Sequence, residues 1–132
     1  MARKRIRVAL IGLGNCASAA IQGLYYYSSN PEKEGLWHPV VGGYRVSDIQ
    51  IVAAIDIDER KTGKDLAEAV FSEPNAFEKH YALPKTGIVV ERGLLEDELN
   101  PYLASMVKPV KQDREKIIEY LRKNNVEIAV NM

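Results

Sequence analysis

Three small residues near the start of the chain have the spacing of a phosphate-binding turn. Gly12, Gly14 and Ala17 lie in the run Gly-Leu-Gly-Asn-Cys-Ala, directly after an apolar segment. In a dinucleotide site the first glycine makes the turn out of a strand, and the second lets the backbone approach a pyrophosphate. The third, small residue lets the following helix pack on that strand. The run therefore predicts a dinucleotide site, with a purely structural turn between strand and helix as the alternative.

The helix expected after this turn adds two residues to the candidate site. Asn15 and Cys16 open it, and the first N–H groups of a helix, together with the positive end of its dipole, attract phosphate. The same dipole can lower the pKa of a cysteine. No histidine stands near Cys16 in the sequence, so we predict a small packed residue there and no nucleophile.

A carboxylate follows the second apolar run, where a dinucleotide site needs one for the adenosine ribose. Asp56 has this place, forty-two positions after Gly14 instead of the usual spacing of about twenty. An irregular insertion over residues 28–47 accounts for the excess. The alternative for Asp56 is a solvated carboxylate at a strand end. Asp58 either contacts the ribose or caps the turn that follows.

The same acid bears on the choice between NAD and NADP. A carboxylate at the ribose would repel a 2′-phosphate, so Asp56 favours NAD. Arg60 and Lys61 follow closely in the sequence and weaken that preference. His38 and His80 lack any Cys/His spacing suited to zinc, so no metal site is predicted.

The elements that must position these residues follow from apolar periodicity. Strands are expected over residues 6–11, 49–55, 87–90 and 126–130, and helices from residue 15, over 63–71 and over 113–124. Residues 93–109 are expected to form a loop with one helical turn near Tyr102. In the last helix Asp113 would be the cap, and Ile117, Ile118 and Leu121 the buried stripe. This order predicts an α/β protein with a parallel sheet of Rossmann type and flanking helices, incomplete at its C-terminal end.

Length and composition limit the alternatives. The 132 residues suit one unit, residues 1–132, and Lys plus Arg balance Asp plus Glu at 18 each, so nothing points to nucleic acid. The basic start, residues 1–5, precedes an apolar run too short for a signal peptide or a membrane span. The single cysteine cannot form an internal disulfide, and we expect a cytoplasmic protein.

Seven segments together resemble inositol-3-phosphate synthase of the prokaryotic type, in its N-terminal, NAD-binding portion. The segments are residues 12–18, 35–38, 43–49, 53–58, 63–66, 87–93 and 126–132. The resemblance covers essentially the whole chain, and the Gly-Tyr-Arg-Val-Ser-Asp insertion before the second strand makes it specific.

This resemblance implies NAD as cofactor and D-glucose 6-phosphate as substrate, in inositol and phospholipid biosynthesis. The family makes 1D-myo-inositol 3-phosphate by transient oxidation, aldol cyclisation and reduction, without net redox change. By position, Gly12, Gly14, Asn15 and Ala17 would hold the pyrophosphate and Asp56 the ribose. Asn131 would lie near the nicotinamide. The resemblance also implies a homotetramer, or association with the remaining part of the enzyme.

The chain also departs from that family. In the family the last strand continues into a Leu-Pro-Val-Gly-Ser loop, and a later catalytic domain supplies the lysines that bind the sugar phosphate. Neither is among these residues, so no catalytic residue is predicted and the chain alone is expected to be inactive. The alternatives are a free-standing NAD-binding sensor or regulatory module, and a dehydrogenase with net hydride transfer.

Overall fold

The computed structural model describes residues 5–96 and 98–132, so Asp97 and most of the basic N-terminal cluster lie outside the described residues. The strands are β1 (Ile6–Ile11), β2 (Ile49–Asp56), β3 (Glu91–Arg92) and β4 (Ile128–Asn131). The helices are α1 (Asn15–Ser29), α2 (Leu66–Ala69), α3 (Pro101–Met106) and α4 (Arg114–Lys123), and a 3-10 turn, η1 (Val46–Asp48), precedes β2. None of the helices in these two ranges has the length and apolar character needed to cross a membrane.

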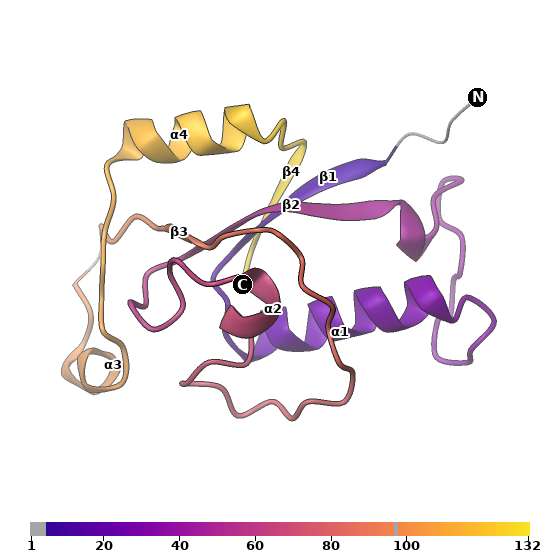
Figure 1. Ribbon diagram of the computed structural model, residues 1–132, viewed down its shortest axis with the longest axis horizontal. Coiled ribbons are helices and arrows are strands. Elements are labelled where there is room, and N and C mark those ends of the chain that lie inside the picture. Colours follow the sequence, from indigo (N-terminus) through magenta and orange to yellow (C-terminus); the bar gives the residue numbers. More distant parts are fainter. Residues whose placement is uncertain (1–4, 97) are drawn as a thin grey trace.

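The strands form one parallel sheet in the order β3-β2-β1-β4. Figure 1 shows α4 on one side of the sheet, and α1 with α2 on the other. The chain starts in the middle of the parallel sheet, moves outward to one edge and then returns to the other side of the first strand. This order is the first half of a doubly wound topology. The predicted α/β sheet of Rossmann type is confirmed.

The centre of this sheet explains where the candidate site lies. The middle of β1 and residues 53–55 of β2 are apolar without alternation, and both are buried, as strands covered on two faces must be. Ile11, the last residue of β1, pairs with Ile55 on one side and with Asn131 on the other. The carboxyl ends of three strands therefore meet at one edge, beside the turn that begins at Gly12.

The helix predicted over residues 63–71 is much shorter in the structure. Gly63 has φ +79°, a left-handed conformation that cannot continue a helix, and α2 covers only Leu66–Ala69. The Gly63 N–H donates to Val90 O at 2.9 Å, and the Val90 N–H donates to Lys64 O at 2.9 Å. These hydrogen bonds hold residues 63–64 against Val90, so tertiary pairing overrides the local helical pattern.

The strand predicted over residues 87–90 is displaced for the same reason. Its residues pair with the segment before α2, through an isolated antiparallel bridge between Asp65 and Val89. The chain joins the parallel sheet only afterwards, at Glu91 and Arg92, which pair with Ile55 and Asp56. A third strand is present as predicted, but it lies at Glu91 and Arg92 instead of residues 87–90.

The second half of the chain agrees better with the expected pattern. Tyr102 lies in α3, which Asn100 caps by accepting a hydrogen bond from the Leu103 N–H at 2.8 Å. Helix α4 falls within the predicted 113–124, but the Asp113 side chain makes no capping hydrogen bond. Ile117 is buried, whereas Ile118 is 40% exposed, so its assignment to the buried stripe is wrong. The last strand runs over Ile128–Asn131 rather than residues 126–130.

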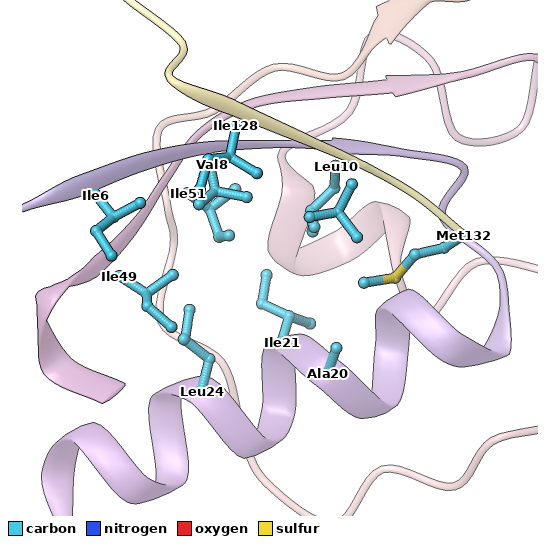
Figure 2. Close-up of a pocket in the computed structure, with 11 residues that line it drawn as sticks. Ile6, Val8, Leu10, Ala20, Ile21, Leu24, Ile49, Ile51, Ile128 and Met132 are labelled. Atoms are coloured by element: carbon cyan, nitrogen blue, oxygen red, sulfur yellow. The ribbon is translucent and has the colours of Figure 1, made fainter. Parts of the chain in front are cut away.

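An apolar groove of about 270 Å³ lies between α1 and the sheet. Figure 2 shows its labelled side chains, from α1, β1, β2 and β4, pointing toward one another across it. The lining residues are Ile6, Val8, Leu10, Ala20, Ile21, Leu24, Ile49, Ile51, Ile128, Val130 and Met132. On the β4 side Ile128 and Met132 remain 47% and 43% exposed, so apolar surface at that side stays in contact with water.

Asp65 anchors α2 to the chain that leads into β3. Its carboxylate accepts hydrogen bonds from the backbone N–H groups of Ala67, Thr86 and Gly87 and from the Thr86 hydroxyl, at 2.7–3.1 Å. Burial opposes ionisation, but these four hydrogen bonds outweigh it and hold the pKa of Asp65 below its usual value.

We therefore expect Asp65→Asn to destabilise the protein at neutral pH more than in acid. A carboxyl whose pKa is lowered on folding contributes stability above its unfolded pKa of about 3.9, and this contribution is lost as the pH falls through the folded pKa. Urea unfolding at pH 7 should show a loss of about 1–2 kcal/mol for the variant, and at pH 3 a smaller one. Equal losses of stability at pH 7 and at pH 3 would show that the charge of Asp65 does not cause the destabilisation.

Candidate functional site

The turn after β1 places Gly12 where only glycine fits. Its φ is +86°, and a Cβ atom built there would lie 2.6 Å from the carbonyl oxygen of Met132. The Gly12 N–H donates to Ile55 O at 2.9 Å, and the Met132 N–H donates to Ile11 O at 2.9 Å. The first glycine of the motif is therefore required by the packing of the chain itself, between the ends of β2 and β4.

The second glycine has a different environment. Gly14 is exposed and has φ −83° and ψ −156°, which other residues also adopt, and no atom lies within 4 Å of a Cβ built on it. It is the N-cap of α1, without a side chain to cap the helix. Among the described residues, the N–H groups of Gly14, Asn15 and Cys16 have no hydrogen-bond partner. Open space over free N–H groups at a helix start has the geometry that a phosphate requires.

The remaining residues of the motif differ in exposure. Cys16 is exposed, contrary to the packed residue predicted there, whereas Ala17 is fully buried. Asn15 is exposed, and its side-chain oxygen accepts a hydrogen bond from the Ala76 N–H at 2.8 Å. The small third residue of the motif thus packs α1 onto the sheet, and Asn15 joins the helix start to the loop at residues 73–76.

Asp56 ends β2 directly beneath the turn. Its Oδ2 accepts a hydrogen bond from the Leu13 N–H at 2.6 Å, and its Oδ1 accepts one from the Asp58 N–H at 2.7 Å. The residue is 8% exposed, so the alternative of a solvated strand-end carboxylate is wrong. Each oxygen retains a lone pair for a further donor.

Asp58 caps the turn that follows β2, one of the two roles predicted for it. Its Oδ1 accepts hydrogen bonds from the Arg60 N–H and Nε at 2.9 Å each, and its Oδ2 lies 2.6 Å from an Arg60 terminal nitrogen. Burial alone would raise the pKa of Asp58, but the hydrogen bonds and charge of Arg60, with the charge of Lys61, hold it below its usual value. The guanidinium of Arg60 also donates to the carbonyl oxygen of Met106 in α3.

Lys61 has a role that its sequence position does not reveal. The capped turn carries its side chain back under the glycine turn, where it is 3% exposed and its ammonium donates to the carbonyl oxygen of Leu13. Burial lowers the pKa of Lys61, although the carboxylates of Asp56 and Asp58 oppose the shift. A lysine after two acids is usually solvated, so only the fold identifies this one.

Two pockets flank the glycine turn. The first, about 320 Å³, is lined by Gly12, Asp56 and Asn131 together with Ile11, Ile55, Ile57, Gly93, Leu94, Ile117 and Met132. The second, about 490 Å³, is lined by Gly14, Asn15, Arg60, Glu73, Pro74, Asn75, Ala76 and Met106. The predicted residues thus divide between two hollows on either side of one turn, and Cys16, Ala17 and Asp58 line neither. Arg60, Met106 and the segment 73–76 were not predicted to belong to the site.

The sheet order and the glycine turn at the end of its first strand define a Rossmann-type α/β protein. No protein-family model matches the chain. The inositol-3-phosphate synthase of Mycolicibacterium smegmatis is 36% identical to it over 129 residues, which make up 96% of this chain and 36% of that protein. The inositol-3-phosphate synthase of Corynebacterium glutamicum is 42% identical over 110 residues, 81% of this chain and 30% of that protein.

Two solved structures are similar to the chain as well. A crystal structure of Ari2 superposes with a TM-score of 0.79 and 31% identity, over 98% of this chain and 38% of that one. A myo-inositol-1-phosphate synthase-related protein from Thermotoga maritima gives a TM-score of 0.59 at 21% identity, over 97% of this chain and 34% of that one, and supports the fold alone. The resemblance is confirmed: this chain is a relative of the inositol-3-phosphate synthases, and spans little more than a third of the length of the synthase from M. smegmatis.

Proposed function

We propose that the chain is the NAD-binding part of an inositol-3-phosphate synthase. The observation that carries the proposal is the start of α1, where Gly14 leaves open space beside the N–H groups of Gly14, Asn15 and Cys16, which have no partner in the part of the chain that the structure describes. Those groups would hold the pyrophosphate, on a turn whose first glycine is fixed by β4. Bound there, NAD supplies a hydride acceptor that can return the hydride later in the same reaction.

The residues after β2 would complete the cofactor site. Asp56 is within the same pocket as Gly12, and the free lone pairs of its carboxylate would accept the ribose hydroxyls. Asp58 would not contact the ribose. Its role would be to cap the turn that follows Asp56. Arg60 is paired with Asp58, and Lys61 donates to Leu13, so neither is a free cation for a 2′-phosphate. This arrangement favours NAD over NADP.

The complete reaction needs residues beyond those in this chain. The proposed substrate is D-glucose 6-phosphate, and the product 1D-myo-inositol 3-phosphate. The proposed partner is a polypeptide equivalent to the part of the synthases that this chain does not match, in a homotetrameric, cytoplasmic enzyme. The apolar groove beside β4 supports such a partner, because its exposed Ile128 and Met132 would gain stability by being covered.

Calorimetric titration of the purified chain with NAD and with NADP tests the cofactor. We expect NAD to bind and NADP to bind at least about tenfold more weakly, because a 2′-phosphate would face Asp56 without a free cation. Absence of NAD binding would refute the proposed function.

The test of the proposed reaction adds the part of the synthases that this chain does not match. Co-expression with the unmatched part of the M. smegmatis synthase, followed by assay with glucose 6-phosphate and NAD, should give inositol phosphate without accumulation of NADH. Accumulating NADH would instead indicate a dehydrogenase. NAD binding without association or turnover would indicate a free-standing binding module.

A further inference from the structure

Leu13, between the two glycines, is held by a side chain at each end of its backbone. Its N–H donates to Asp56 Oδ2 at 2.6 Å, and its carbonyl oxygen accepts a hydrogen bond from the ammonium of Lys61. Leu13 itself is fully buried, and Asp56 and Lys61 are 8% and 3% exposed. Two buried, oppositely charged groups therefore act on one residue of the turn, and we call Asp56 and Lys61 the Leu13 clamp.

The clamp determines the direction of the next N–H group. The Leu13–Gly14 peptide is trans and planar, so the Leu13 carbonyl and the Gly14 N–H point in opposite directions. Lys61 binds the carbonyl from the buried side, and Gly14 is exposed. The Gly14 N–H is therefore directed away from the interior, toward the side on which a phosphate can approach.

A turn with glycine at both ends needs such a restraint. Glycine has wide backbone freedom, and among the described residues no atom lies within 4 Å of a Cβ built on Gly14, so side-chain packing at that position does not restrain the Leu13–Gly14 peptide. Rotation would bring the carbonyl oxygen to the exposed side, where it would repel an anion. Hydrogen bonds to charged groups are the stronger kind, and the Lys61 backbone is held in the turn by its N–H, which donates to Asp58 O at 3.0 Å.

From this geometry we infer that Lys61 is a positioning residue for phosphate: it fixes the Leu13–Gly14 peptide so that the Gly14 N–H faces the pyrophosphate, without touching the ligand itself. The inference rests on the proposed dinucleotide function for its ligand, and on the two hydrogen bonds of Leu13 for its geometry.

The test uses Lys61→Met, which keeps the apolar stem and removes the donor. Its matched control is Lys64→Met, since Lys64 lies three residues away and its ammonium contacts Ser72 and Glu68. Binding of ADP and of adenosine is measured by titration followed through amide NMR spectra. In Lys61→Met we expect ADP to bind about tenfold to a hundredfold more weakly and adenosine to bind unchanged, whereas Lys64→Met should bind both as the parent does.

A general loss of structure would weaken adenosine and ADP alike, so an equal loss for both ligands would overturn the positioning role. Unchanged ADP affinity would overturn it as well. The Gly14 amide signal provides a readout without ligand: it should shift or broaden in Lys61→Met while the Gly63 amide signal stays in place. If the parent binds neither ADP nor NAD, the proposed function fails, and the Gly14 signal still decides whether the clamp exists.

The unaltered protein provides a second measurement, in case Lys61→Met does not fold. A buried ammonium that donates to a carbonyl exchanges its protons with water slowly, so the Lys61 Nζ protons should give a protected NMR signal, unlike those of exposed lysines. Exchange as fast as that of Lys64 would overturn the inference.

Discussion

Replacement of Gly14 by alanine is expected to abolish dinucleotide binding in a protein that remains folded. A Cβ at this position meets no atom of residues 5–96 and 98–132 within 4 Å, and φ −83° suits alanine. The new methyl group would instead stand where the pyrophosphate must approach the N–H groups of α1. Each hydrogen bond to a charged group contributes about 1.5–3 kcal/mol, so the loss of two would weaken NAD by a factor of about a hundred or more.

Gly23→Ala is the matched control for this substitution. Gly23 lies in the same helix and also has no atom within 4 Å of a built Cβ, so the change adds a methyl group far from the turn. We expect normal NAD affinity and about 1 kcal/mol of added stability from the better helix propensity of alanine. Gly14→Ala should lose no more than about 1 kcal/mol of stability. Calorimetry and thermal unfolding of both variants measure the two effects. Normal NAD binding by Gly14→Ala would exclude the start of α1 as the phosphate site.

The second large effect is expected from Gly12→Ala, which should reduce stability rather than block a ligand directly. Alanine at φ +86° costs about 1–2 kcal/mol in backbone strain, and its Cβ would lie 2.6 Å from Met132 O. That oxygen cannot retreat freely, since the Met132 N–H bonds to Ile11 O. The free energy of unfolding should fall by about 2–4 kcal/mol in total.

Gly63→Ala separates the two causes of that loss. Gly63 has φ +79° and open space around a built Cβ, so its replacement by alanine adds strain of the same kind without the contact. Urea unfolding should show a loss of about 1–2 kcal/mol for Gly63→Ala and a larger loss for Gly12→Ala. Equal losses would mean that the end of β4 does not close on the turn as described.

The two glycines also show how far sequence reasoning reaches. Their spacing, between an apolar run and a helical pattern, predicted the turn and its place at the sheet edge. Spacing could not reveal that Gly12 is required by contact with Met132, 120 residues later in the chain, while a Cβ at Gly14 would meet no atom of the described residues within 4 Å. That difference depends on the pairing of β4 with β1, a long-range contact that local pattern does not encode.

In the segment after β2, by contrast, tertiary contacts override the structure that the local pattern predicts. The residues from Gly63 to Phe71 have a helical pattern, yet hydrogen bonds with residues 88–90 keep the first of them out of the helix. Asp56 is expected at the ribose, which stays a prediction, and its carboxylate also accepts a hydrogen bond from the Leu13 N–H. Lys61 is expected from the sequence only to weaken the preference for NAD, and it lies buried beneath the turn, where its ammonium donates to Leu13 O. Burial of a charge depends on which partners the fold brings within reach, and no property of a single residue predicts that.

The sequence by itself determined the class of fold and the strand-to-helix turn, because apolar periodicity and glycine spacing are local properties of the chain. The resemblance to inositol-3-phosphate synthases rested on seven matching segments of the sequence. Only the tertiary structure decided which hydrogen bonds Asp56, Asp58 and Lys61 make and where β3 joins the sheet. It also decided that the candidate residues line two pockets rather than one. Each of these outcomes arises from contacts between segments far apart in the chain, where the gain from burial and paired hydrogen bonds exceeds the local preference of each residue.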